Sequence, residues 1–350
     1  MKPINDNSYF LSGAYVEITS RCNLRCLHCY NESGDLKSEL SVENMRNILD
    51  SIPAPQESTI TFSGGEPLLH PEFWKFVSMA VKRKFQKILV ITNATLVTDE
   101  IAQKLAENKC SVQVSLNGRE DVQHDRLCGK GNFQKTLTGI RRLLKYENEV
   151  IIRCTVSRYT KDDLIECTKY FVGLGIKNVT FGILRESGRE VKNKEVLSVD
   201  SKELVRIVGE FNSSAEIQGL IESGIKIGMP DPISMGCPFV FHSDKPIPVS
   251  PRIDSSGDVY ICQAFSNPLY SIGNVKSDTL SRIIDSEQFY GLLNFFCCGL
   301  NYMHKCQKCF WNSSCGRGCI AINLDSGSIQ ETDGMCELRC EAMENQLFSN

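Results

Sequence analysis

A chain of 350 residues is longer than most single hydrophobic cores, so its length predicts one large domain and a smaller one. Its 39 basic and 42 acidic residues give a formal net charge of -3, which excludes the strong field of a nucleic-acid or anionic-membrane partner. No apolar run approaches the roughly 18 residues of a transmembrane helix, and the N-terminus lacks the pattern of a signal peptide. We therefore expect a cytoplasmic protein.

The 17 cysteines are the compositional outlier, and they gather toward the C-terminal end. A large chain without a signal peptide is expected in a reducing compartment, where disulfides are rare. Ligation of metal is therefore the better explanation of this cysteine content.

The first predicted strand, residues 14–19, runs directly into a loop that carries Cys22, Cys26 and Cys29. Three thiolates at this C-x3-C-x2-C spacing suit a [4Fe-4S] cluster that keeps one iron open for a non-protein ligand. Zinc is the alternative, but His28 lies too close to Cys26 and Cys29 to complete a tetrahedron with both. The spacing therefore favours a cluster over zinc.

Strand and helix patterns then alternate along the chain. Further strands are predicted at 59–62, 88–92, 112–116, 150–156 and 179–184, and helices at 39–50, 71–84, 99–108, 133–146 and 162–174. Six β/α repeats predict an α/β fold with a parallel sheet and helices outside it, and the run is too short for an eight-stranded barrel. We expect an open, partial six-stranded (β/α)6 barrel over residues 1–197.

The pattern changes after the barrel. Residues 198–223 are helical in pattern, and glycine and proline become dense over 224–251. We therefore predict a helical bridge at 198–235 and a small cysteine-rich iron–sulfur domain at 236–350.

The cysteine loop after the first strand and Gly64-Gly65-Glu66-Pro67 after the second strand together resemble the radical S-adenosylmethionine (SAM) superfamily. The resemblance implies that SAM chelates the open iron through its amino and carboxylate groups. It also implies reductive cleavage of SAM to a 5'-deoxyadenosyl radical, which abstracts a hydrogen atom from the substrate.

The resemblance also assigns contacts with SAM. Gly64, Gly65 and Glu66 would hold its amino group, and His28 would pack near its adenine. The contacts implied at the ends of later strands are Thr92, Asn93, Ser115, Asn117, Arg153 and Leu184, with Ser115 serving the ribose and Arg153 the carboxylate. An ordinary strand-end role is the alternative for each of them. Two departures are Ala94, where relatives often have glycine, and Asn117, where they often have aspartate.

The second group of cysteines has the pattern C-x2-C-x5-C-x3-C and follows a G-x4-C motif. This order resembles the SPASM extension of radical SAM enzymes, which carries two auxiliary clusters. The resemblance assigns Cys237, Cys262 and Cys319 to the first auxiliary cluster and Cys306, Cys309, Cys315 and Cys336 to the second, so three [4Fe-4S] clusters are expected in all. A zinc ribbon is the alternative for the quartet.

The roles of several cysteines stay open. Cys340 competes with Cys336 as the last ligand, Cys297 and Cys298 have no assigned role, and the first auxiliary cluster has only His242, Ser243 and Asp244 near its missing fourth ligand. That cluster therefore leaves room for an iron open to substrate. The remaining cysteines, Cys110, Cys128, Cys154 and Cys167, are expected to be small buried hydrophobic residues.

The resemblance implies that the chain modifies a ribosomally made peptide by crosslinking, oxidation or epimerisation. Alternatives are a small-molecule enzyme such as a haem-precursor decarboxylase, and a non-catalytic iron–sulfur or zinc protein. Gln263 stands where sulfatase-maturating enzymes place an aspartate base, which argues against that reaction. Expected partners are the peptide or small-molecule substrate, an electron donor such as flavodoxin or ferredoxin, and a separate peptide-recognition protein, because little sequence precedes the barrel. No acid–base residue is assigned.

Overall fold

The computed structural model describes residues 9–34, 37–184, 187–230, 237, 239, 246–265, 267–298, 303–312, 314–315, 318–325 and 336–348. Its main feature is a 10-stranded sheet in the order β12-β11-β10-β2-β3-β4-β5-β6-β7-β8. The six strands expected for the barrel form its parallel middle: β2 (Gly13–Thr19), β3 (Thr59–Gly64), β4 (Lys87–Thr92), β5 (Ser111–Ser115), β6 (Glu149–Val156) and β7 (Asn178–Ile183). The expected α/β class and partial barrel are confirmed.

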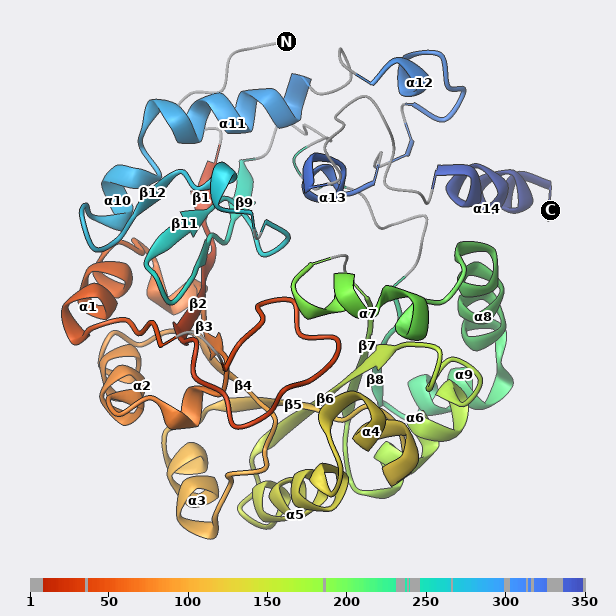
Figure 1. Ribbon diagram of the computed structural model, residues 1–350, viewed down its shortest axis with the longest axis horizontal. Coiled ribbons are helices and arrows are strands. Elements are labelled where there is room, and N and C mark those ends of the chain that lie inside the picture. Colours follow the sequence, from red (N-terminus) through yellow and green to blue (C-terminus); the bar gives the residue numbers. More distant parts are fainter. Residues whose placement is uncertain are drawn as a thin grey trace.

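Helices follow the strands and cover the outside of the curved sheet (Figure 1). They are α1 (Val42–Asp50), α2 (Phe73–Lys82), α3 (Asp99–Glu107), α5 (Asn132–Lys145) and α6 (Leu164–Gly173). Two further helices, α4 (Asp121–Cys128) and α7 (Arg189–Leu197), form backbone hydrogen bonds with the segment that follows β2. Helix α1 shows why the pattern works: Ser41 caps it by accepting from the Asn44 N–H, and its apolar stripe of Met45, Ile48 and Leu49 is buried. Helices α4 and α7 were not predicted.

The expected bridge consists of two helices, α8 (Ser201–Ser213) and α9 (Ala215–Glu222), and a short strand, β8 (Lys226–Gly228). Strand β8 pairs in parallel with β7 and extends one edge of the sheet. The other edge is extended by β10 (Arg252–Ile253), parallel to β2, and then by the antiparallel β11 (Asp258–Tyr260) and β12 (Gly273–Asn274). The sheet therefore continues from the barrel into the C-terminal region.

A second connection is a two-stranded parallel sheet of β1 (Tyr9–Leu11) and β9 (Ile247–Val249). The remaining helices of the C-terminal region lie in the upper part of Figure 1, above the barrel: α10 (Leu280–Ile283), α11 (Glu287–Cys298), α12 (His304–Gln307), α13 (Ile320–Asp325) and α14 (Cys336–Phe348). Short 3-10 turns are at η1 (Pro55–Glu57), η2 (Pro67–Leu69) and η3 (Pro268–Tyr270).

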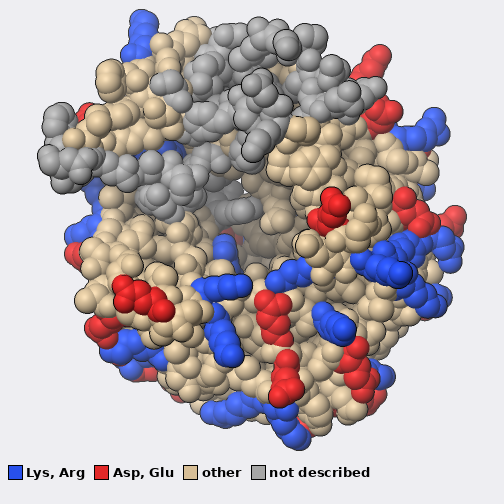
Figure 2. Space-filling view, turned by 180° about the vertical axis from the view of Figure 1, so that it is seen from behind, with Lys and Arg blue, Asp and Glu red and all other residues tan. Residues whose placement is uncertain are grey.

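Basic and acidic side chains are interspersed over the face shown in Figure 2, as the near-balanced composition leads one to expect. In the described part of the chain, no helix combines the length and the apolar character needed to cross a membrane.

Candidate functional site

A cavity of about 510 Å³ lies at the carboxyl ends of the barrel strands, where ligands bind in parallel β/α folds. Each of β2 to β7 contributes to its wall, and so does the cysteine loop, by which we mean residues 20–34. This loop crosses the open end of the barrel in Figure 1. Gln263 of the C-terminal region also lines the cavity, so both parts of the chain contribute to it.

The three cysteines of the loop, Cys22, Cys26 and Cys29, all line this cavity and are half-buried. Among the described residues, no group of three or more His, Cys, Asp or Glu side chains is arranged to hold a metal ion. A four-iron cluster is larger than an ion, so its thiolates are spaced more widely, and three cysteines on one cavity wall supply the donors that it needs. The donor chemistry therefore fits a cluster with an open iron.

The Gly-Gly-Glu turn is pressed against the start of the cysteine loop. The Gly65 N–H donates to the Thr19 carbonyl at 2.7 Å, and the Glu66 N–H donates to the Arg21 carbonyl at 2.8 Å. A Cβ on Gly65 would lie 2.2 Å from the Arg21 carbonyl oxygen, which leaves room for glycine alone. Gly64 and Gly65 both line the cavity, so the two motifs share one wall.

Glu66 has a different position. Its fully buried carboxyl group accepts from the Thr92 hydroxyl at 2.8 Å, the Asn93 N–H at 2.9 Å and the Leu68 N–H at 3.2 Å. Burial raises its pKa to about 7, although these hydrogen bonds act in the opposite direction. Glu66 is not among the residues that line the cavity, and its side chain joins the ends of β3 and β4. Its contact with SAM stays a prediction.

Two imidazoles, those of His28 and His124, line the cavity. The Asn117 N–H donates to His124 Nδ1 at 3.1 Å, which assigns the ring proton of neutral His124 to Nε2. Burial lowers the pKa of each imidazole to about 4, so both are neutral near pH 7. Within the described residues, His28 Nδ1 and His124 Nε2 are buried without a hydrogen-bond partner, and such groups suit a polar ligand. The role of His28 near adenine stays a prediction, and sequence reasoning missed His124.

The strand-end residues divide into two groups. Those that line the cavity are Thr92, Asn93, Ser115, Arg153 and Leu184. Asn117 is fully buried and does not line it: its Oδ1 accepts from the Thr155 N–H at 2.8 Å, and its Nδ2 donates to Cys128 Sγ at 3.5 Å. Asn117 joins β5, β6 and α4, and its contact with SAM stays a prediction.

Ala94, one of the two departures from the family pattern, has a φ of 60°. This left-handed conformation costs a non-glycine residue roughly 1–2 kcal/mol, which explains why relatives use glycine there. The backbone turn is nevertheless retained, because the Ala94 N–H donates to the Thr92 hydroxyl at 3.0 Å.

Helix α7 holds the backbone of the cysteine loop. The Arg189 N–H donates to the Cys29 carbonyl at 2.9 Å, and Arg189 Nε donates to the Cys26 carbonyl at 2.9 Å. Asn193 Nδ2 donates to the Leu27 carbonyl at 3.3 Å. These carbonyls belong to the segment that carries the cysteines, so α7 fixes its path. Sequence patterns do not indicate this role, because residues 189–197 are mostly polar and carry no motif.

Helix α4 also contacts the cysteine loop. The Leu27 N–H donates to the Leu127 carbonyl at 2.9 Å, and the adjacent Cys128 is buried and lines the cavity. A hydrogen bond with the Cys128 thiol, together with burial, raises the pKa of Cys26 well above its ordinary value. Cys128 is thus buried as expected, and it also contacts a predicted cluster ligand.

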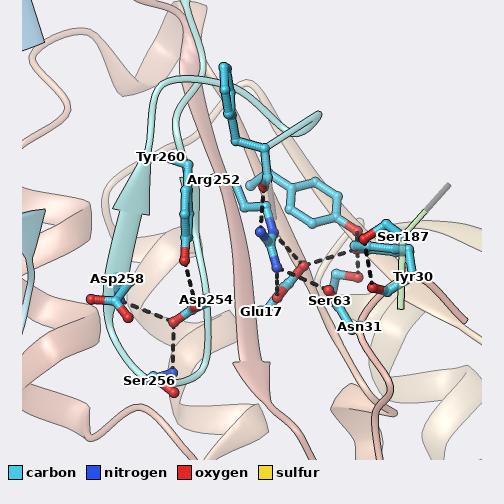
Figure 3. Close-up of polar contacts among 12 residues, drawn as sticks. Glu17, Tyr30, Asn31, Ser63, Ser187, Arg252, Asp254, Ser256, Asp258 and Tyr260 are labelled. Atoms are coloured by element: carbon cyan, nitrogen blue, oxygen red, sulfur yellow. Dashed lines mark hydrogen bonds and ion pairs between the residues drawn. The ribbon is translucent and has the colours of Figure 1, made fainter. Parts of the chain in front are cut away.

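A buried ion pair connects the barrel to the C-terminal region (Figure 3). On β10, Arg252 donates through Nε and Nη2 to the two carboxylate oxygens of Glu17 on β2, at 2.8 and 2.9 Å. The same guanidinium donates to Asn31 Oδ1 of the cysteine loop at 2.9 Å and to the Phe265 carbonyl at 2.6 Å. A single arginine therefore joins β2, the cysteine loop and the segment after Cys262.

A second cavity, of about 230 Å³, lies in the C-terminal region and is rich in cysteine. Its wall includes Cys306, Cys309, Cys315, Cys336 and Cys340. The four cysteines assigned to the second auxiliary cluster are thus brought together. Both Cys336 and Cys340 are present, so the choice of the last ligand stays open.

The residues assigned to the first auxiliary cluster, Cys237, Cys262 and Cys319, are half-buried and pack against the main hydrophobic core. The polar residues near its missing ligand, His242, Ser243 and Asp244, lie outside the described residues, as do the side chains of Cys297 and Cys298. Cys110, Cys154 and Cys167 are buried, as expected.

Two family models match the chain. The model of the radical SAM superfamily matches residues 16–171, and that of the iron–sulfur cluster-binding domain called SPASM matches residues 250–310. These ranges contain the cysteine loop and the G-x4-C motif that carried the resemblance in sequence.

Curated relatives are similar over much of the chain. A cysteine-type anaerobic sulfatase-maturating enzyme from Clostridium novyi is 27% identical over 337 residues, which cover 86% of this chain and 85% of that protein. An AdoMet-dependent heme synthase from Methanosarcina barkeri is 29% identical over 206 residues, which cover 58% of this chain and 59% of that protein. The solved structure of native anSMEcpe with bound AdoMet and the Cp18Cys peptide has a TM-score of 0.74 at 20% identity and covers 95% of both chains, which shows a shared fold.

Proposed function

The chain belongs to the radical SAM superfamily and carries a SPASM iron–sulfur domain, and we propose that it is a maturase that modifies a ribosomally made peptide. The observation that supports this most is that one cavity, the one of about 510 Å³, is lined by the cysteine loop, the glycine turn and Gln263 from the segment after Cys262. A relative whose name states that it matures sulfatases agrees with a polypeptide substrate.

In this proposal, Cys22, Cys26 and Cys29 hold one [4Fe-4S] cluster and leave an iron for SAM. When SAM is bound and the cluster is reduced, the two together would supply a 5'-deoxyadenosyl radical that abstracts a substrate hydrogen atom. Two further clusters are held by Cys237, Cys262 and Cys319 and by Cys306, Cys309, Cys315 and Cys336. An electron donor such as flavodoxin or ferredoxin and a separate peptide-recognition protein complete the proposed system.

The protein residues position and shield the reactants. Gly64 and Gly65 have no Cβ that would collide with the Thr19 and Arg21 carbonyls, so the turn packs against the cysteine loop and its backbone lines the cavity where the SAM amino group would bind. Arg153 supplies a guanidinium for the SAM carboxylate, and Ser115 supplies a hydroxyl for the ribose. The neutral imidazoles of His28 and His124 face the same space and offer polar contacts without adding charge. Positioning of this kind matters more for hydrogen abstraction than proton transfer does.

The test uses the anaerobically reconstituted protein with SAM, a reductant and the peptides encoded beside its gene. We expect 5'-deoxyadenosine together with a mass change in one peptide, and neither in a Cys22→Ala variant. Failure to release deoxyadenosine from SAM would reject radical chemistry and support a non-catalytic iron–sulfur protein. Release of deoxyadenosine without a change in any of these peptides would reject the peptide substrate.

A small-molecule reaction is the second candidate, and similarity to the heme synthase favours it. Under this alternative, the same assay with a haem-precursor porphyrin should release carbon dioxide from its side chains, and the peptides should stay unmodified. The two assays therefore separate the two substrate classes.

A further inference from the structure

Three hydroxyl groups on the cavity wall form a chain that ends on a buried carboxylate. Ser63 Oγ lies 2.8 Å from the Tyr15 hydroxyl, which lies 2.9 Å from the Tyr30 hydroxyl. The Tyr30 hydroxyl donates to Glu17 Oε1 at 2.9 Å. Ser63, Tyr15 and Tyr30 all line the cavity, and Figure 3 shows Ser63 and Tyr30 beside the ion pair of Glu17 and Arg252.

The ion pair fixes the direction of every hydrogen bond in this chain. Glu17 and Arg252 have side chains only 4% and 5% exposed and meet in a two-point contact, so the carboxylate acts as an acceptor. The ordinary pKa of a phenol is about 10, so both tyrosines carry their protons near pH 7, and the Tyr30 hydroxyl donates to Glu17 Oε1. The Tyr30 proton is committed to Glu17, and the Tyr30 oxygen can therefore only accept from Tyr15.

The direction of the hydrogen bond between Tyr15 and Ser63 is fixed as well. The Tyr15 proton is committed to Tyr30, so the short contact between Tyr15 and Ser63 requires the Ser63 hydroxyl to donate. Its proton is then directed at Tyr15, and only oxygen lone pairs remain for a ligand. A serine that is unconstrained can rotate and donate or accept, whereas this one is restricted to accepting.

We propose that Ser63 is a hydrogen-bond acceptor of fixed polarity, set by Arg252 of the C-terminal region, and that it binds an ammonium or amide N–H of the ligand in the cavity. This inference rests on the proposed function, because it needs a ligand there. Ser63 directly precedes Gly64, so the donor is either the ammonium group of SAM or an N–H of the substrate. Tyr15 and Tyr30 act through Ser63 and are positioning residues.

The test measures SAM dissociation constants by anaerobic calorimetry on the reconstituted protein. Hydrogen bonds to charged groups contribute about 1.5–3 kcal/mol, so Ser63→Ala should weaken binding at least about tenfold if the donor is the SAM ammonium. Tyr15→Phe should weaken binding less, because the Ser63 hydroxyl is then free to rotate but can still accept. Ser63→Thr keeps the hydroxyl and should retain binding. An analogue of SAM without the α-amino group should bind the wild type and Tyr15→Phe equally.

Tyr260→Phe is the matched control. Tyr260 lies over the same guanidinium, 5.1 Å from its central carbon to the ring centroid, and donates to Asp254 Oδ2 at 3.4 Å. It does not line the cavity, so its loss should change SAM affinity less than about twofold. If the donor belongs to the substrate, Tyr15→Phe and Ser63→Ala should leave SAM affinity unchanged and raise KM for the modified peptide, with kcat little changed.

The outcomes distinguish a failure of the proposed function from a failure of the inference about Ser63. A wild type that does not bind SAM would refute the proposed function itself. A wild type that binds SAM, with neither SAM affinity nor peptide KM altered in Ser63→Ala, would refute only the inference about Ser63. If no peptide is modified, the SAM measurements alone decide, and if Tyr15→Phe does not fold, the comparison of Ser63→Ala with Ser63→Thr decides.

Discussion

Glu66 is a buried acid whose environment works in two directions. Its carboxyl oxygens accept three hydrogen bonds, yet burial raises its pKa from 4.5 to about 7. Between about pH 4.5 and pH 7, the native protein therefore keeps a proton on Glu66 that the unfolded chain has released. The stability that comes from this proton is complete below about pH 4.5 and is lost as the pH rises to about 7.

Replacing Glu66 with glutamine removes this titration. The free energy of unfolding of the wild type, minus that of Glu66→Gln, should fall by about 3 kcal/mol between about pH 5 and pH 8. Anaerobic urea titrations followed by circular dichroism measure this difference. A difference that does not vary with pH would contradict the assignment.

The comparison with a variant matters because His28 and His124 titrate in the opposite sense. Their pKa values are lowered to about 4, so they contribute stability that is present above pH 6.5 and is lost as the pH falls toward 4. Both proteins contain these histidines, and subtraction removes their effect.

At the scale of single elements, the end of β3 depends on glycine. Gly65→Ala would place a methyl group 2.2 Å from the Arg21 carbonyl oxygen, so the turn must move away from the cysteine loop. We expect a loss of about 2 kcal/mol or more in unfolding free energy, with less iron retained after reconstitution. Iron analysis and urea midpoints check both effects.

The matched control for that substitution is Gly209→Ala in α8. A Cβ at Gly209 meets no atom within 4 Å, and alanine in a helix is favoured over glycine by about 0.5–1 kcal/mol. The control should therefore be neutral or slightly stabilising. Equal iron content in the two variants would show that the contact between turn and loop is not needed.

Helix α7 carries the second element-scale prediction. Arg189→Gln removes bonds to the Cys26 and Ser33 carbonyls and should weaken the cysteine loop by about 1–2 kcal/mol. The expected result is faster loss of iron to a ferrous chelator. Arg189→Lys keeps the charge without the two-point contact, and it should lose iron almost as fast.

Lys192→Gln is the control on the same helix, because its ion pair with Glu32 has side chains 72% and 43% exposed and contributes little. If Lys192→Gln accelerates iron loss as much as Arg189→Gln does, the effect belongs to the charge of α7 and not to its hydrogen bonds.

Sequence patterns predict some elements of this fold and not others. The six barrel strands were predicted to within two residues of their ends, because each is rich in the β-branched residues valine, isoleucine and threonine. Strands β10 and β12 have two residues each and carry no periodic signal. Motifs predicted the three cysteines that line the cavity, whereas Arg189 and Arg252 reach the cysteine loop from more than 150 positions away along the chain. No spacing rule encodes such contacts.

At the scale of the whole molecule, the barrel and the C-terminal region share one sheet. Strand β10 continues the sheet beyond β2, and Asn47 of α1 donates to the Val275 and Asp278 carbonyls at 3.2 and 2.9 Å. The boundaries at 197 and 235 stay predictions from sequence. The shared sheet nevertheless places Gln263, the residue after Cys262, on the wall of the barrel cavity.

The Glu17–Arg252 pair is the most buried charged contact between these two parts in the described residues, so it should couple their stabilities. Glu17→Gln or Arg252→Met alone should cost about 3–5 kcal/mol, because each leaves a buried charge unpaired. The double variant leaves no unpaired charge and should cost less than the sum of the two. Urea unfolding of all four proteins measures the coupling.

The control is Arg282→Met, which removes an ion pair with Asp278 whose side chains are 78% and 41% exposed. This variant should change the free energy of unfolding by less than about 1 kcal/mol. If the two losses simply add, the pair does not couple the barrel to the C-terminal region, and the polarity of the hydroxyl chain must be set by Glu17 alone.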